Sequence, residues 1–168
     1  MTAKDAAALF GQAVGGRGWY APPDTRALIT KQPGVMRFLE PGAYRMMYGV
    51  ARMSKNGTGI SGDNYTYSGS LPGQVIMSLS DGMGSGAAAD QESRKVIELL
   101  QQLLETGFSA RSALKMVNTI LMLTGTEQHP ATLDLCCVDL CSGVLEAMKM
   151  GAVATFVLSN GQAEILDA

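Results

Sequence analysis

The chain has 168 residues, of which 46% are apolar and 17% are charged, and its formal net charge is −2. This length and apolar content are sufficient for one folded domain with a buried core, which excludes wholesale disorder. The slightly acidic balance argues against a nucleic-acid-binding surface. No run approaches the ~20 apolar residues of a membrane span, and the first residues lack the order of a signal peptide. We therefore expect a cytoplasmic segment; a membrane anchor elsewhere in a longer parent protein is compatible with this expectation.

Residues 1–43 are rich in glycine and proline, which favour turns and irregular chain. A short helix is predicted over residues 6–14. We interpret residues 1–43 as an N-terminal lead-in or regulatory segment, and residues 44–168 as the main domain.

From residue 44 the pattern indicates strands. Residues 44–53 predict a mostly buried strand, and a glycine-rich loop follows over 54–62. Residues 63–67 alternate in the manner of a strand, and residues 74–80 predict another, which runs directly into Asp81 and Gly82.

Two consecutive helices and a strand meander make up the rest of the chain. Apolar residues at helical spacing predict helices over 87–106 and 110–124. Strands are then predicted over 132–140, 144–150, 152–159 and 162–166, with a hairpin turn at Asn160-Gly161. This order predicts an α+β fold in which a helix pair lies on an antiparallel sheet.

The cysteines and the single histidine offer little chemistry. Cys136, Cys137 and Cys141 match no zinc-binding spacing, and we interpret them as free, buried structural thiols. Cys136 and Cys137 point to opposite faces if they lie on a strand. His129 lies in a connecting loop beside Pro130, where a histidine is usually a surface residue.

Two aspartates occupy contexts that suit a cation site. Asp63 follows a glycine-rich loop, and Asp81 ends an apolar strand directly before Gly82. If the two strands are adjacent and antiparallel, both carboxylates reach the same end of the sheet. Hard divalent cations prefer carboxylate and backbone carbonyl oxygens, and Gly82 lets its carbonyl approach a cation closely. The alternative is a pair of ordinary turn aspartates, since Asp-Gly is a common turn dipeptide.

A nucleotide site is a rival interpretation of the same loop. Gly82, Gly84 and Ala87 satisfy a loose dinucleotide-binding pattern between a strand and a helix. Asp81 would, however, place a negative charge beside the pyrophosphate. A second helix also follows where that fold requires a parallel strand.

Four segments together resemble the phosphatase domain of the stage II sporulation protein E family, a branch of the PPM metal-dependent serine/threonine phosphatases. The resemblance covers residues 44–166, and its most specific elements are Ser61-Gly62-Asp63 and residues 80–84. The segments are YGVARMSKNGTGISGDNY, SLSDGMGSGAAADQES, ATLDLCCVDL and the strand at residues 151–157.

This resemblance implies a fold, a site and a reaction. The fold is a PPM-type αββα sandwich of antiparallel sheets with a helix hairpin. Asp81 matches the aspartate that bridges two Mn²⁺ or Mg²⁺ ions, Gly82 a carbonyl ligand, and Asp63 an aspartate of the second ion's shell. The helix pair at 87–124 matches one that can shift and control metal binding. The implied activity is hydrolysis of a phosphorylated anti-sigma-factor antagonist-like protein by a metal-activated hydroxide.

The chain also departs from the family pattern. A second aspartate-glycine element and a late pair of aspartates, which supply further ligands in the family, are absent, and Arg52 is not assigned the family's phosphate-holding role. We therefore expect residues 44–168 to form a phosphatase domain that is incomplete at its C-terminus and inactive by itself. The alternative is a non-catalytic, truncated or degenerate interaction module. Unpaired sheet edges also favour homo-oligomers.

Overall fold

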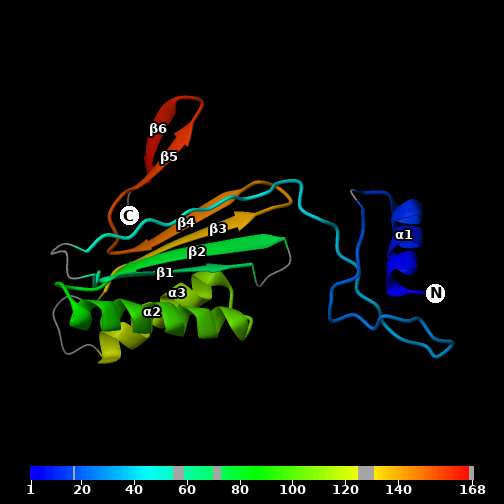
Figure 1. Ribbon diagram of the computed structural model, residues 1–168, viewed down its shortest axis with the longest axis horizontal. Helices are drawn as coiled ribbons and strands as arrows, with labels where there is room; N and C mark the ends of the chain where they lie inside the picture. Colours follow the sequence, from blue (N-terminus) through cyan, green and yellow to red (C-terminus); the bar gives the residue numbers. More distant parts are fainter. Residues whose placement is uncertain (17, 55–58, 70–72, 125–130, 167–168) are drawn as a thin grey trace.

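The elements follow one another as one helix, two strands, two helices and four strands (Figure 1). The computed structural model describes residues 1–16, 18–54, 59–69, 73–124 and 131–166. The helices are α1 (Ala3–Val14), α2 (Ala87–Glu105) and α3 (Ala110–Thr124). The strands are β1 (Asp63–Ser68), β2 (Gln74–Asp81), β3 (Leu133–Asp139), β4 (Leu145–Met150), β5 (Thr155–Ser159) and β6 (Gln162–Leu166).

The strands form a four-stranded antiparallel sheet and a separate hairpin. The order in the sheet is β1-β2-β3-β4, and β5 pairs only with β6. In Figure 1, α2 and α3 lie on one side of the sheet, whereas the extended chain before β1 and the β5–β6 hairpin lie on the other. We call these the helix face and the outward face. This is the α+β arrangement of antiparallel strands and a helix pair that the sequence predicts.

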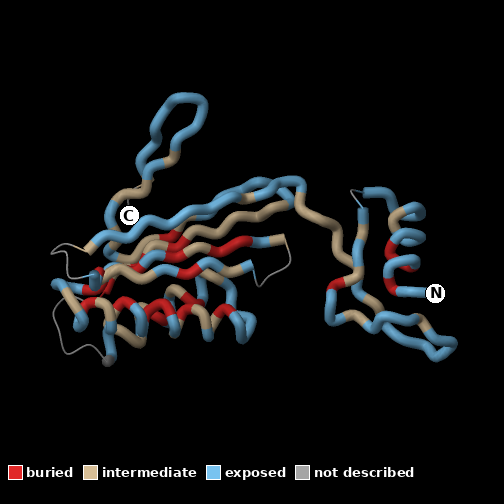
Figure 2. The backbone as a smooth tube through the Cα atoms, in the orientation of Figure 1, coloured by how far each residue is buried: buried red, intermediate tan, exposed pale blue. Residues whose placement is uncertain are grey.

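The core lies between the helices and the helix face of the sheet, where Figure 2 shows the buried residues of both layers. Side chains of a strand alternate between its two faces, so every second residue faces the helices. Leu100, Leu133 and Leu135 are fully buried at 0% exposure, and they belong to one apolar cluster. The other buried members of that cluster are Ile76, Val96, Ile97, Leu104, Ala113, Val117, Ala131 and Met148.

The N-terminal segment has its own small set of contacts and lies apart from the sheet (Figure 1). Thr2 and Asp5 form a capping box at the start of α1, which satisfies backbone N–H groups that the helix leaves unpaired. Phe10 packs against Trp19 and Phe38, with ring centroids 5.1 and 5.3 Å apart. This aromatic cluster holds the following loop against the helix.

One predicted strand is wrong. Residues 44–53 are extended, but they form no regular strand and are mostly exposed. Among the residues described, they make isolated contacts: the Tyr44 N–H donates to the Leu140 carbonyl at 2.9 Å, the Tyr48 ring stacks on Tyr67, and Arg52 donates to Asp90 at 2.7 Å. A strand requires a ladder of backbone hydrogen bonds to a neighbour, and an apolar sequence does not supply that neighbour. Within the described ranges, no helix has both the length and the apolar content to cross a membrane.

Leu100→Ala should strongly destabilise the protein, because α2 places this side chain fully inside the core. We expect a loss of about 2–5 kcal/mol in the free energy of unfolding, as for other buried leucines. Leu123→Ala is the matched control, since Leu123 lies on α3 with 80% exposure, and it should change stability by at most about 0.5 kcal/mol. Urea unfolding measures both. Equal losses in the two variants would contradict this description of the core.

Candidate metal centre

The pairing of β1 with β2 brings the two predicted carboxylates together. Asp63 and Asp81 are direct cross-strand partners at one end of the sheet. Partners directly opposite each other on antiparallel strands point to the same face, with Cβ atoms about 5 Å apart. Tyr65 and Leu79 form the next pair along on that face, which is the outward one. The structure therefore meets the geometric condition that the sequence set for a cation site.

Gly62 and Gly82 let the backbone close around these carboxylates. A Cβ added to Gly62 would lie 3.3 Å from the Gly82 carbonyl oxygen and 3.7 Å from Asp81 Oδ1, so both oxygens lie beside Gly62. A Cβ added to Gly82 would lie 2.0 Å from the Ala89 carbonyl oxygen of α2. Position 82 therefore requires glycine because the first turn of α2 packs directly on it.

The electrostatics of the pair suit a cation. Partial desolvation raises the pKa of Asp81. The negative charge of Asp63 and a hydrogen bond between the two carboxyl groups raise it further. Like charges directly opposite on a sheet repel each other, and a divalent cation relieves that repulsion. Asp63 Oδ2 also accepts a hydrogen bond from Ser61 Oγ at 2.7 Å. With the Gly82 carbonyl, the donors are oxygens of the kind that Mg²⁺ and Mn²⁺ prefer.

The cluster provides only part of a coordination shell. Within the described part of the chain, no three His, Cys, Asp or Glu side chains gather in an arrangement suited to a metal ion. Asp90, Asp134 and Asp139 each serve other contacts. Asp134 pairs with Lys149 at 2.7 Å, and Asp139 Oδ1 accepts the backbone N–H groups of Cys141 and Ser142.

Sequence reasoning missed a polar network on the helix face, directly behind the carboxylates. Asn64 Nδ2 donates to Ser93 Oγ at 2.8 Å and lies 3.1 Å from Asp90 Oδ1. Ser93 Oγ donates to the Gly62 carbonyl at 2.5 Å. A signal was present, since Asn64 follows Asp63 and must face the opposite side of the strand, and Asp90 and Ser93 lie three apart on one helix side.

Arg52 belongs to this network, in which its guanidinium group bonds protein oxygens. Its Nη2 atom donates to the Ser61 carbonyl at 2.6 Å and to Asp90 Oδ1 at 2.7 Å. Arg94 donates to the other oxygen of Asp90 at 2.8 Å. Hydrogen bonds from Arg94, Arg52 and Asn64, in that order of effect, hold the pKa of Asp90 well below its usual range. This carboxylate is therefore ionised and fully engaged at neutral pH.

The structure disfavours the nucleotide interpretation of the loop. The Gly82 N–H donates to the Gly62 carbonyl at 3.0 Å, and the Met83 N–H donates to Glu92 Oε2 at 3.3 Å. Two amides that would face a pyrophosphate therefore face protein oxygens, one of them anionic. The pairings of the four-stranded sheet are all antiparallel, whereas the dinucleotide-binding fold requires a parallel sheet.

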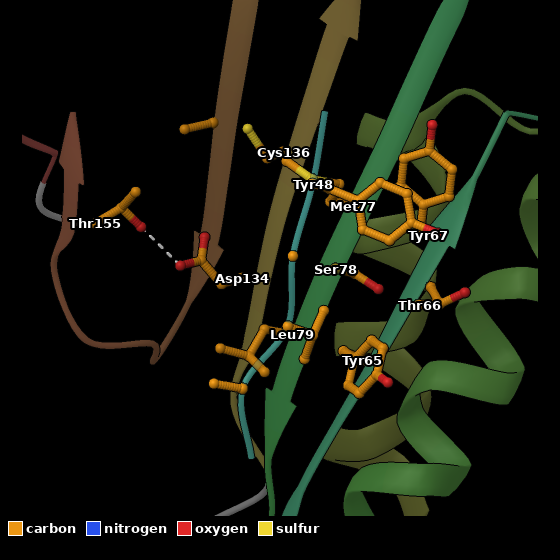
Figure 3. A pocket seen from close by; sticks show the side chains of 14 residues that line it. Tyr48, Tyr65, Thr66, Tyr67, Met77, Ser78, Leu79, Asp134, Cys136 and Thr155 are labelled. Atoms are coloured by element: carbon orange, nitrogen blue, oxygen red, sulfur yellow. Dashed lines mark hydrogen bonds between the residues drawn. The ribbon is translucent and has the colours of Figure 1, made fainter. Parts of the chain in front are cut away.

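An apolar groove of about 370 Å³ lies on the outward face (Figure 3), and its lining includes Tyr65 and Leu79, the cross-strand pair next to the carboxylates. Residues 48–51 line the groove together with side chains of β1, β2 and β3. Asp134 and Thr155 also line it, and the Thr155 hydroxyl donates to Asp134 Oδ2 at 2.8 Å. Neither Asp63 nor Asp81 lines it, so the groove and the carboxylate cluster are separate features of one face. The lining side chains include Tyr48, Tyr65, Tyr67, Met77, Leu79 and Cys136.

The thiols carry no evident chemistry. All three cysteines are free; Cys136 and Cys137 are half-buried, whereas Cys141 is exposed, contrary to the expectation of burial. Burial raises the pKa of Cys136, and it raises that of Cys137 to about 11, so both thiols stay protonated at neutral pH and are poor nucleophiles. His129 lies outside the described residues.

Comparison with known proteins relates the chain to one family. The family model described as stage II sporulation protein E (SpoIIE) matches residues 72–168. Stage II sporulation protein E of Bacillus subtilis (strain 168) is 36% identical over 120 residues, which are 71% of this chain but 14% of that protein. The Priestia megaterium protein of the same name is 36% identical over 115 residues, 68% of this chain and 20% of that protein.

A solved structure shows the same relationship in three dimensions. It contains the PP2C phosphatase domain and a fragment of the regulatory domain of SpoIIE from Bacillus subtilis. The match has a TM-score of 0.72 and 34% identity, and it covers 78% of this chain and 39% of that one. The chain therefore has a PP2C (PPM-type) fold, and it spans less than half the length of each of these relatives.

Gly82→Ala should displace the first turn of α2, because the added methyl group would overlap the Ala89 carbonyl. We expect a loss of about 1–3 kcal/mol in unfolding free energy, typical of overpacking. Gly69→Ala is the control, since a Cβ there meets open space, and it should leave stability nearly unchanged. Chemical denaturation followed by circular dichroism measures both; a Gly82→Ala variant as stable as the wild type would refute the close approach.

Proposed function

The chain belongs to the stage II sporulation protein E family, and from this premise we propose that it is part of a metal-dependent protein serine/threonine phosphatase. The observation that supports this activity is the cross-strand pairing of Asp63 with Asp81 beside the Gly82 carbonyl. These oxygens occur in a PP2C-type fold, and the neighbouring cysteines lack the setting of a nucleophile. A mechanism without a side-chain nucleophile is consistent with both facts.

The residues that would hold Mn²⁺ or Mg²⁺ are Asp63 and Asp81, through their carboxylates, and Gly82, through its carbonyl. Bound divalent cations supply acidified water near neutral pH and positive charge for phosphoryl oxygens. The chain's own contribution is positioning. The Ser61 hydroxyl donates to one carboxylate oxygen of Asp63. The Thr132 N–H donates to the Asp81 carbonyl at 2.9 Å, and the Asp81 N–H donates to the Thr132 hydroxyl at 3.2 Å.

The proposed substrate is a phosphoserine protein of the anti-sigma-factor antagonist type, which follows from the family and not from a feature of the surface. We assign the catalytic portion to residues 44–168. Residues 1–43 are proposed to be a regulatory lead-in, because they make their own contacts around Phe10, Trp19 and Phe38.

An interaction module is the second candidate, and the β5–β6 hairpin favours it. Phe156, Leu158 and Ile165 are 65%, 79% and 63% exposed. Phe156 pairs directly with Ile165, and Leu158 lies two residues along, so all three share one face of the hairpin. An exposed apolar face of this kind is typical of a surface that another protein segment covers, including a second copy of the chain. The two candidates differ in one requirement, since only the phosphatase needs cation binding at Asp63 and Asp81.

Asp81→Asn and Asp63→Asn should each weaken Mn²⁺ binding. Loss of a residue that hydrogen-bonds a metal ligand typically costs 10–100-fold in metal affinity, so loss of a ligand itself should raise the dissociation constant by about tenfold or more. The measurement is water-proton relaxation during a Mn²⁺ titration of the whole chain. Asp24→Asn removes the same charge from an exposed ion pair with Arg37 and should change the constant by less than about twofold. Equal constants in all four proteins would reject the metal centre.

The 168-residue chain should bind Mn²⁺ weakly and release phosphate from a phosphoserine peptide at close to the background rate. The physical reason is that Asp63, Asp81 and Gly82 leave most of the six positions around such an ion to water. A phosphate-release assay with and without Mn²⁺ tests this expectation. Robust Mn²⁺-dependent turnover by the wild-type chain, lost in Asp81→Asn, would overturn the expected weakness while supporting the phosphatase assignment.

A further inference from the structure

The Gly62 carbonyl joins the metal centre to α2. This oxygen accepts a hydrogen bond at 3.0 Å from the N–H of Gly82, the residue after β2, and another at 2.5 Å from the Ser93 hydroxyl on α2. The Ser93 hydroxyl has one hydrogen to donate, and Gly62 is the nearest of its acceptors, since the Ala89 and Asp90 carbonyls lie at 3.1 and 3.2 Å. The hydroxyl is fully buried, so water does not compete for this bond.

Asn64 makes a second connection one peptide away from Asp63. The strand turns Asp63 outward and Asn64 toward α2, where the Asn64 amide donates to Ser93 Oγ at 2.8 Å and to the Asp90 carbonyl at 3.0 Å. A change in the position of α2 at this point therefore moves the backbone that carries Asp63. Gly62 and Asn64 flank Asp63 on both sides, so its backbone is held from the helix at both neighbours.

Asp90 keeps this part of α2 in place. Its two carboxylate oxygens accept Arg52 and Arg94 at 2.7 and 2.8 Å. Arg52 also donates to the Ser61 carbonyl at 2.6 Å, two residues before Asp63. The network thus contacts the backbone before Asp63, at Ser61 and Gly62, and the side chain after it, at Asn64.

Two other polar side chains in the same interface lack this connection. Gln101 Nε2 donates to Thr66 Oγ1 at 2.6 Å, a bond between α2 and β1 that lies farther along both elements. The Ser80 hydroxyl is as buried as that of Ser93, but it has no hydrogen-bond partner among the described residues. These residues separate the effect of a general helix–sheet contact from the effect of a bond to the metal centre.

We propose that Ser93 and Asn64 are positioning residues of the metal centre, which hold the Gly62 carbonyl and Asp63 in the arrangement that binds a divalent cation. This inference rests on the proposed function, because it assumes that Asp63, Asp81 and Gly82 bind the cation. Neither residue touches the cation in this proposal. Their effect is on affinity, since ligands that are held in place bind with a smaller ordering cost than ligands that must be fixed on binding.

The test compares four alanine variants of the whole chain in a Mn²⁺ titration followed by water-proton relaxation. Ser93→Ala and Asn64→Ala should each raise the dissociation constant for Mn²⁺ by about tenfold, the effect typical of outer-shell partners. Ser80→Ala and Gln101→Ala should stay within about twofold of the wild type, because the Ser80 hydroxyl has no partner among the described residues and Gln101 bonds Thr66 away from the metal centre. A purely structural role would lower the thermal midpoint without this difference in affinity.

The outcomes separate the inference from the proposed function. If Asp63→Asn and Asp81→Asn weaken binding but Ser93→Ala and Asn64→Ala change it by less than about threefold, the positioning role is refuted and the metal centre stands. A Gln101→Ala effect as large as that of Ser93→Ala also refutes it, because helix docking alone would then account for the result. If the aspartate variants bind Mn²⁺ as the wild type does, the metal centre itself is rejected.

Hydrogen exchange of the wild-type chain gives a second measurement that does not depend on the folding of the alanine variants. Coupling between two sites is reciprocal, so Mg²⁺ should slow amide exchange in residues 87–93 and leave residues 100–105 unchanged. Equal exchange of residues 87–93 with and without saturating Mg²⁺ would overturn the proposal. Asp81→Asn is the control here, since Mg²⁺ should no longer protect residues 87–93 in that variant.

Discussion

The antiparallel register of β1 and β2 is the constraint on which the site depends. Because Asp63 is paired with Asp81, the two carboxylates share one face and one end of the sheet. A shift of one residue in this register would turn one carboxylate toward the helices. The register is held from the helix face, where Asn64 bonds Ser93 and Thr66 bonds Gln101.

The arrangement carries an electrostatic cost that indicates its use. Two carboxylates directly opposite each other destabilise a sheet, and the pKa of Asp81 is raised by partial desolvation first and by the charge of Asp63 second. A purely structural position would be better served by a neutral or oppositely charged partner, as Asp134 has in Lys149. Perturbed pKa values cluster at functional sites, which agrees with the proposed metal centre at the end of β1 and β2.

The outward face explains why one strand prediction failed. Residues 44–53 and the β5–β6 hairpin carry apolar side chains, yet Tyr48, Phe156 and Leu158 are largely exposed. An apolar pattern alone therefore did not determine whether these residues form a strand. Strand formation, however, requires a ladder of backbone hydrogen bonds, and the single bond from the Tyr44 N–H to the Leu140 carbonyl is no such ladder.

The sequence alone determined the α+β order, most element boundaries and the choice of Asp63, Asp81 and Gly82 as candidate ligands, because periodicity and glycine-rich turns are local properties of the chain. Tertiary structure decided which residues support them. Asn64, Asp90, Ser93 and Arg52 look like ordinary surface or helix residues in sequence, and they meet only when α2 packs on β1. Contacts between residues 26 to 38 positions apart depend on packing, and local sequence patterns carry no record of packing.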